Sequence, residues 1–271
     1  MSLVTTDWLE NNLNKVKILD CSWHLPNENR NSYNEYLSEH IPNAIFFDLD
    51  KNSNLKSDLP HMLPDKKTWE QNISKIGINN KDRIIIYDNS DVLSSCRCWY
   101  NFIYFGHDPK LVSVLDGGLK KWKIEKKIIS KEIKNIVKSN YQANEIRELV
   151  KNKDQINKNI QKKEFEVIDA RSKKRFDGLV PEPRDNVRSG SIKNSFCIPF
   201  NELLNENRTF KNRDVISNKF TQILGNHNEK KIVFSCGSGV TAAVLALAYS
   251  LINNKYSPSI YDGSWAEYGK I

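Results

Sequence analysis

Short runs of apolar residues alternate along the chain with longer segments of helical length. Residues 83–87 and 231–235 have the length and β-branched content of buried strands. Residues 93–105 and 241–252, which follow these runs, have the length and periodicity of helices. Because buried strands that alternate with helices are typical of βαβ units, we predict an α/β fold built on mostly parallel sheets, with helices on both faces.

The same series of motifs occurs twice. Residues 18–20, 39–47, 84–88 and 114–118 match residues 167–169, 189–197, 231–236 and 260–264 in the same order. The spacing agrees, since Asp20 and Asp88 are 68 positions apart and Asp169 and Cys236 are 67 apart. This period is too long for a solenoid repeat, so each copy is predicted to be a domain. We assign residues 1–124 to the first domain, 125–140 to a surface linker rich in Lys, Ile and Asn, and 141–271 to the second domain.

Composition and charge narrow the class of protein. The chain is 39% hydrophobic and carries a formal charge of +8, much of it on lysines scattered between Lys120 and Lys174. No aromatic-studded basic strand accompanies them, so we expect no nucleic acid partner, and small anionic substrates remain compatible with the charge. The longest apolar stretch, near residues 240–252, is too short to span a bilayer, and the start lacks a leader pattern, so we expect no membrane partner and a cytoplasmic location. Five cysteines, an odd number, favour reduced thiols over a disulfide framework.

The two copies differ at one position that carries chemistry. After the third matched strand the first copy has Asp88, whereas the second has Cys236, which opens the sequence Cys-Gly-Ser-Gly-Val-Thr-Ala. Ligands bind at the carboxyl ends of strands in such sheets. Gly237 and Gly239 allow a tight turn of inward-pointing N–H groups, and the helix near Thr241 adds its positive end. These effects lower a cysteine pKa and favour a nucleophilic thiolate, although a buried structural cysteine before a turn is the alternative.

Several motifs together resemble the rhodanese superfamily, and in particular its two-domain 3-mercaptopyruvate sulfurtransferases. They are the tandem copies, the Cys-Gly-Ser-Gly-Val-Thr-Ala loop, the Pro-Glu-Pro-Arg segment at residues 181–184 and the Tyr-Asp-Gly-Ser-Trp ending at residues 261–265. The resemblance covers nearly the whole chain. It implies two rhodanese-like domains, of which the first, with Asp88, is not catalytic.

The resemblance also implies roles for individual residues. Cys236 matches the nucleophile that forms a persulfide, and Arg175 and Arg184 match two arginines that hold the substrate carboxylate. The loop residues Gly237, Gly239, Val240 and Thr241 are expected to contact the substrate. Ser238, His61 and Asp48 match a proposed Ser-His-Asp proton relay. Without the resemblance, each arginine would be interpreted as a surface charge, His61 as a loop histidine and Asp48 as a helix cap.

The activity so implied moves sulfur from 3-mercaptopyruvate through a Cys236 persulfide to an acceptor, which is thioredoxin, a small thiol or cyanide, and releases pyruvate. No cofactor is expected, and no metal, since Cys96 and Cys98 form a lone C-x-C without a nearby histidine. Arg97, between them, matches an arginine usual in the family, but we assign it no catalytic role.

Three alternative functions are open. A thiosulfate sulfurtransferase would use basic side chains in the loop, where this chain has Gly237 and Ser238. A cysteine phosphatase of related fold would need Arg at the sixth position after the cysteine, which is Ala242. A rhodanese-like binding module would not need the loop glycines, Ser238 and both arginines together.

The sequence departs from the family pattern in a turn. Family members usually have glycine at the end of a His-Ile-Pro-Gly motif, whereas the two copies here have Asn43 and Asn194. We expect this difference to affect turn geometry and stability and not the chemistry.

Overall fold

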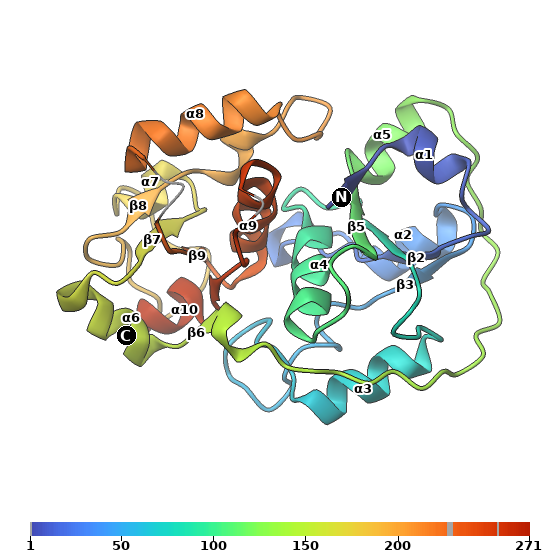
Figure 1. Ribbon diagram of the computed structural model, residues 1–271, viewed down its shortest axis with the longest axis horizontal. Helices are drawn as coiled ribbons and strands as arrows, with labels where there is room; N and C mark the ends of the chain where they lie inside the picture. The colour runs from blue at the N-terminus through green and yellow to red at the C-terminus, as the bar shows by residue number, and fades with distance from the viewer. Residues whose placement is uncertain (1, 227–229, 254) are drawn as a thin grey trace. The chain divides into compact units, whose positions relative to one another are not determined.

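The computed structural model describes residues 2–226, 230–253 and 255–271 (Figure 1). The chain divides into two compact units. The first unit contains Met1–Leu55, Leu63–Ile146 and Asn205–Thr209, and the second contains Lys56–Met62, Arg147–Leu204 and Phe210–Ile271. Each unit therefore takes one short segment from the other half of the chain. His61 belongs in this way to the second unit, with Cys236.

The first unit contains a five-stranded sheet in the order β1-β5-β4-β2-β3. All of its strand pairs are parallel. The strands are β1 (Leu3–Val4), β2 (Lys17–Asp20), β3 (Ala44–Phe46), β4 (Ile84–Tyr87) and β5 (Val112–Leu115). The helices are α1 (Thr6–Glu10), α2 (Ser32–Ser38), α3 (Lys66–Lys75), α4 (Ser94–Tyr104) and α5 (Gly118–Ile124), with a 3₁₀ turn at Pro26–Glu28.

The second unit repeats this arrangement, with a parallel sheet in the order β6-β10-β9-β7-β8. Its strands are β6 (Val150–Lys151), β7 (Glu166–Asp169), β8 (Phe196–Cys197), β9 (Ile232–Ser235) and β10 (Ile260–Tyr261). Its helices are α6 (Lys153–Lys162), α7 (Lys173–Phe176), α8 (Arg213–Leu224), α9 (Val240–Ile252) and α10 (Ser264–Tyr268), with 3₁₀ turns at Arg147–Leu149 and Phe200–Leu203. The two strand orders correspond position by position, which confirms the predicted α/β fold of two tandem copies.

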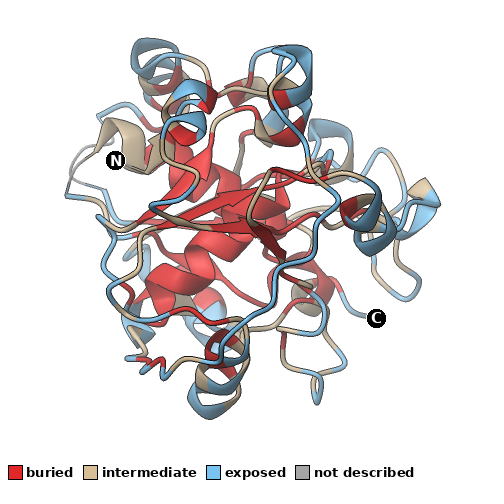
Figure 2. Ribbon diagram, turned by 90° about the vertical axis from the view of Figure 1, so that its right-hand side faces the viewer, coloured by how far each residue is buried: buried red, intermediate tan, exposed pale blue. Residues whose placement is uncertain are grey.

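Alternating side chains of each sheet pack against helices on opposite faces. In β9, Val233 belongs to a core cluster with residues of α6 and α10, while the next residue, Phe234, packs edge-on against Phe220 of α8 and Tyr249 of α9. Because successive residues of a strand point to opposite faces, strands covered on both sides are apolar throughout. Figure 2 shows the same layering in the first unit, where buried strands lie between helices; most of these helices expose their outer surfaces, whereas α4 is buried along its whole length.

Asparagine takes the place of glycine in the turn before the third strand of each copy. Asn43 and Asn194 both have left-handed backbone conformations, with φ of 70° and 63°. Asparagine is the residue after glycine that best tolerates this region. Each side chain also donates a hydrogen bond to a backbone carbonyl, of Leu13 for Asn43 and of Ile160 for Asn194. The turn geometry is therefore kept without glycine.

The predicted linker follows α5 as an extended segment. Two backbone hydrogen bonds hold it to the first unit. The His40 amide donates to the Ser130 carbonyl at 2.9 Å, and the Ser130 amide donates to the His40 carbonyl at 2.8 Å. No helix among the described residues is long and apolar enough to cross a membrane.

Candidate active site

Cys236 follows the last residue of β9, at the carboxyl end of the second sheet, as the sequence predicted. The loop that it opens leads directly into α9, whose N-cap, Gly239, has φ of 77°. A side chain is unfavourable in this conformation, so glycine is the natural residue for the turn. The strand, loop and helix therefore adopt the local geometry that a nucleophile needs at this sheet edge.

Helix α10 fixes the orientation of the loop peptides through backbone hydrogen bonds. The carbonyl of Cys236 accepts from the Trp265 amide at 2.9 Å, and the carbonyl of Gly237 accepts from the Ala266 amide at 2.8 Å. Since N–H and C=O of a trans peptide point in opposite directions, the amides of Gly237 and Ser238 turn away from α10. Successive amides turned the same way form a concavity that stabilises an anion.

The thiol itself is not open to solvent. Cys236 is 1% exposed, although the sequence predicts a reactive thiolate at this position. The burial arises because the loop closes around its first residue and is held to α10 by backbone hydrogen bonds. A donor must therefore reach the sulfur past the neighbouring side chains, and Arg175 and Arg184 are both partly exposed.

The two predicted anchor arginines lie against this loop. A Cβ placed on Gly237 would lie 3.3 Å from Nη2 of Arg175 and 3.5 Å from Nη1 of Arg184. Burial lowers the pKa of the Arg184 guanidinium; Cys236 opposes this effect, and the charge of Arg175 adds to it. The structure thus brings Arg175, Arg184 and the loop of Cys236 together, and glycine at position 237 leaves room for both guanidinium groups.

Ser238 and His61 also meet, although they are far apart in the sequence. Oγ of Ser238 lies 3.0 Å from Nδ1 of His61 and accepts from Nη2 of Arg184 at 3.3 Å. His61 and Ser238 are 5% and 6% exposed. A buried hydroxyl between an imidazole and a guanidinium can accept or pass on a proton.

Asp48, the third residue of the expected relay, makes local contacts. Its Oδ1 accepts from the Lys51 amide at 3.1 Å, and its Oδ2 pairs with the Lys51 ammonium at 2.9 Å. These contacts are those of a residue that caps a turn. Its part in a proton relay stays a prediction.

A charged network that the sequence did not reveal supports the two arginines. Arg171 pairs with Asp169 at 2.6 Å and with Glu182 at 2.8 Å, and its guanidinium stacks on Trp265 at 4.5 Å. Glu182 in turn holds Arg175 through both carboxylate oxygens. The available signals were an Asp at the end of a strand, an Arg two residues later, and a Glu two residues before Arg184 in the Pro-Glu-Pro-Arg segment.

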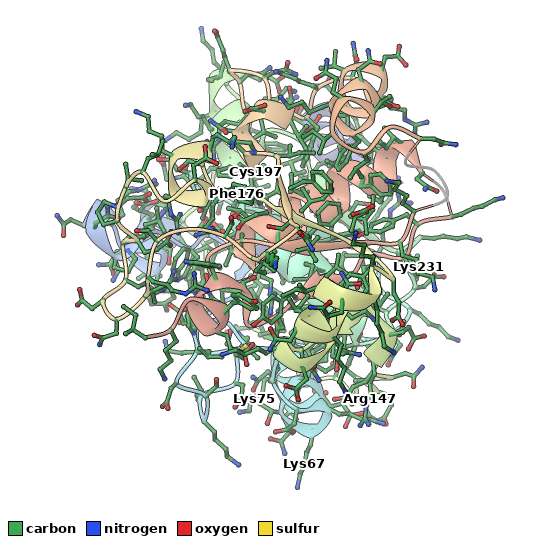
Figure 3. All side chains as sticks on the ribbon, turned by 90° about the vertical axis from the view of Figure 1, so that its left-hand side faces the viewer. Lys67, Lys75, Arg147, Phe176, Cys197 and Lys231 are labelled. Atoms are coloured by element: carbon green, nitrogen blue, oxygen red, sulfur yellow. The ribbon has the colours of Figure 1, made fainter. Side chains whose placement is uncertain are left out.

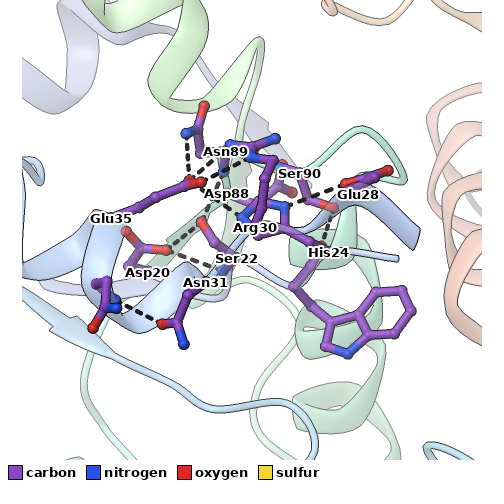
Figure 4. A network of polar contacts seen from close by, with 12 residues as sticks. Asp20, Ser22, His24, Glu28, Arg30, Asn31, Glu35, Asp88, Asn89 and Ser90 are labelled. Carbon is purple, nitrogen blue, oxygen red and sulfur yellow. Dashed lines mark hydrogen bonds and ion pairs between the residues drawn. The ribbon is translucent and has the colours of Figure 1, made fainter. Parts of the chain in front are cut away.

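The corresponding loop of the first unit is filled by its own carboxylate (Figure 4). Asp88 Oδ1 accepts from the Ser90 amide at 3.0 Å, and Oδ2 accepts from the Ser95 amide at 2.8 Å. Burial raises the pKa of Asp88, although these hydrogen bonds oppose the effect. The side chain thus occupies the place where an anion would be held, and a carboxylate cannot form a persulfide.

Cys21, Cys96 and Cys98 belong to the first unit, whereas Cys197 lies near the charged network, since its Sγ donates to the Arg171 carbonyl at 3.4 Å. Cys96 and Cys98 are fully buried in α4, and burial raises the pKa of Cys96 well above its ordinary value. Arg97 is also buried, with its guanidinium 5.6 Å from the centre of the Tyr100 ring. Within the described ranges, no group of three or more His, Cys, Asp or Glu side chains is placed to hold a metal ion.

Comparisons with known proteins agree with this geometry. The model of the rhodanese-like domain matches residues 5–125 and 152–270. The chain is 39% identical to thiosulfate/3-mercaptopyruvate sulfurtransferase 1, mitochondrial, of Arabidopsis thaliana, over 98% of this chain and 75% of that protein. It is 34% identical to human 3-mercaptopyruvate sulfurtransferase, over 98% of this chain and 91% of that protein.

A solved structure supports the same assignment. The crystal structure of SseA from Escherichia coli, described as a 3-mercaptopyruvate sulfotransferase with the rhodanese fold, superposes with a TM-score of 0.87 at 32% identity. The match covers 98% of this chain and 99% of the other. With two matched domains, two corresponding parallel sheets and a cysteine loop at the carboxyl edge of the second, the chain belongs to the rhodanese-like family.

Proposed function

We propose that the chain is a 3-mercaptopyruvate sulfurtransferase in which Cys236 is the nucleophile. The observation that carries the proposal is the position of two guanidinium groups, of Arg175 and Arg184, against the glycine that follows Cys236. A donor carboxylate held by these planar groups would bring its sulfur to the cysteine. The names and full-length similarity of the relatives support the same reaction.

The first half-reaction balances without a cofactor. The Cys236 thiolate attacks the donor thiol, an S–S bond forms, and the donor C–S bond breaks with its electron pair left on carbon as pyruvate enolate. The proton of the donor thiol ends on that carbon, so the products are pyruvate and a Cys236 persulfide anion. The loop amides of Gly237 and Ser238 stabilise the negative charge on sulfur.

Ser238 is the group best situated to carry this proton. Its hydroxyl is hydrogen-bonded to His61 and lies next to Arg184, which holds the substrate in this proposal. The hydroxyl would pass the proton to the enolate carbon, and His61 would orient it. Val240 and Thr241 extend the line of amides at the start of α9.

An acceptor thiol, such as a small thiol or thioredoxin, or cyanide then takes the outer sulfur and restores the thiolate. Transfer to a thiol forms an acceptor persulfide, and transfer to cyanide forms thiocyanate. This second step needs no oxidant or reductant, because the transferred atom is sulfane sulfur both in the Cys236 persulfide and in the product.

Thiosulfate is the alternative donor. The Arabidopsis relative carries both donors in its name, whereas loop residues Gly237 and Ser238 offer no basic side chain for a dianion. We expect kcat/KM for 3-mercaptopyruvate to exceed that for thiosulfate, and Cys236→Ser to abolish turnover of both. A higher value for thiosulfate would overturn the proposed donor.

Phosphatase activity is a weaker alternative. The sixth residue after Cys236 is Ala242, which is buried in α9 and cannot bridge phosphate oxygens. Hydrolysis of p-nitrophenyl phosphate that is lost in Cys236→Ser would count in its favour.

A cytoplasmic location is part of the proposal. The Arabidopsis relative is named as mitochondrial, which is the alternative location. Fractionation of cells that express a tagged chain, followed by immunoblotting, tests the location directly.

A further inference from the structure

Glu182 is almost completely enclosed by arginines. Its side chain is 3% exposed and contacts Arg171 through Oε1 and Arg175 through both oxygens. Asp169 neutralises Arg171 and accepts three hydrogen bonds from its guanidinium group, two from Nε and one from Nη2. A buried carboxylate is costly unless it is paired, and Glu182 is paired twice.

The cluster therefore has an uneven charge balance. Three guanidinium groups, of Arg171, Arg175 and Arg184, face two carboxylates, of Asp169 and Glu182, which leaves one net positive charge to set against the Cys236 thiolate and the donor. Of these three, Arg184 has no ion pair with a carboxylate among the described residues and donates instead to the Ser238 hydroxyl. This single charge lies beside the Cys236 loop.

The chemistry of the two donors makes this balance important. 3-Mercaptopyruvate carries one negative charge on its carboxylate, whereas thiosulfate carries two. Because the Cys236 thiolate already faces this single positive charge, each further negative charge on the donor is costly, and a dianion, which loses more hydration than a monoanion, is disfavoured more strongly. Removal of one carboxylate charge would provide the second positive charge that a dianion needs.

We infer that Glu182 determines the donor specificity of this site: its charge offsets that of Arg175 and so favours monoanionic over dianionic sulfur donors. The inference rests on the proposed function. Glu182 is a specificity-determining residue that acts through Arg175, and it also holds the Arg175 fork in place beside Gly237.

The test is the variant Glu182→Gln, which keeps the shape and a hydrogen-bond acceptor but removes the charge. We expect the ratio of kcat/KM for thiosulfate to kcat/KM for 3-mercaptopyruvate to rise by about tenfold, the size of effect typical of one nearby charge. Competitive inhibition by sulfate should strengthen by a similar factor, with little change in inhibition by acetate.

A matched control is available on the same sheet. Glu166→Gln removes a carboxylate that pairs with Lys230 at 3.1 Å, at the amino end of β7, and should leave the ratio unchanged. Figure 3 labels Cys197, at the carboxyl end of β8, and Lys231, which precedes β9 and whose carbonyl accepts from the Glu166 amide at 2.8 Å. Thermal unfolding of both variants reports whether the fold is intact.

The outcomes separate the two proposals. A fall in kcat/KM by the same factor for both donors in folded Glu182→Gln would overturn the specificity role and leave Glu182 as a structural partner of Arg175. An unchanged ratio would also overturn it. Failure of wild-type protein to form a Cys236 persulfide from either donor would instead overturn the proposed function.

Discussion

At the scale of single residues, the account depends on Arg184 as the uncompensated positive charge beside the cysteine loop. Replacement by glutamine should lower kcat/KM for 3-mercaptopyruvate by about ten- to a hundredfold, since a hydrogen bond to a charged group contributes about 1.5–3 kcal/mol. Most of the effect should appear in KM, because the lost contact holds the carboxylate before and during transfer. Arg213→Gln, at the exposed start of α8, is the control of equal charge. Steady-state kinetics that leave Arg184→Gln as active as this control would exclude the anchoring role.

At the scale of elements, helix α10 keeps the loop in place. The Ser264 hydroxyl accepts from the Cys236 amide at 3.2 Å and donates to the Tyr261 carbonyl at 2.8 Å, although Ser264 has a left-handed φ of 48°. The first copy has Gly118 at the corresponding position, with φ of 56°. Backbone strain is thus retained where the hydroxyl supports the nucleophile.

Two variants of Ser264 distinguish the effect of losing the hydroxyl from the effect of relieving the backbone strain. Ser264→Ala should lower the free energy of unfolding by about 1–3 kcal/mol, because it leaves the buried Cys236 amide without its acceptor and keeps the strained backbone. Ser264→Gly should be less destabilised, since glycine adopts this φ freely, yet both variants should transfer sulfur more slowly. Urea unfolding and donor kinetics test this; equal stability of the two variants would show that strain at this residue is absent.

The elements also show what the sequence could and could not predict. The sequence was sufficient to predict the repeat, the strand before Cys236 and the glycine turn, because apolar periodicity and glycine placement are local signals. The pairing of Glu182 with Arg171 and Arg175 was not, since it depends on how the segment after α7 returns to the sheet. The membership of His61 in the second unit was likewise hidden, because no local pattern reveals that Lys56–Met62 packs with the other half.

At the scale of the whole molecule, one buried carboxylate makes stability depend on pH. Burial raises the pKa of Asp20, at the end of β2, to about 6, while hydrogen bonds from Ser22 oppose the effect (Figure 4). A carboxyl whose pKa is raised by folding stabilises the fold in its neutral form. Its contribution is complete below the unfolded value near 4 and is lost as the pH rises through about 6.

Asp20→Asn removes this dependence but keeps an oxygen that can accept from Ser22. We expect the variant to be more stable than wild type at pH 7.5, by roughly 1–3 kcal/mol, and the difference to vanish toward pH 4. Urea unfolding at several pH values measures it. A difference that is constant from pH 4 to pH 7.5 would mean that Asp20 is ionised throughout.

The most direct test of the account is the mass of the intact protein after incubation with 3-mercaptopyruvate and removal of the donor. The account predicts a gain of one sulfur atom on wild type, localised to the peptide that contains Cys236 and released by an added thiol, with no gain on Cys236→Ala. An unmodified wild-type mass, or sulfur found on another cysteine, would contradict it.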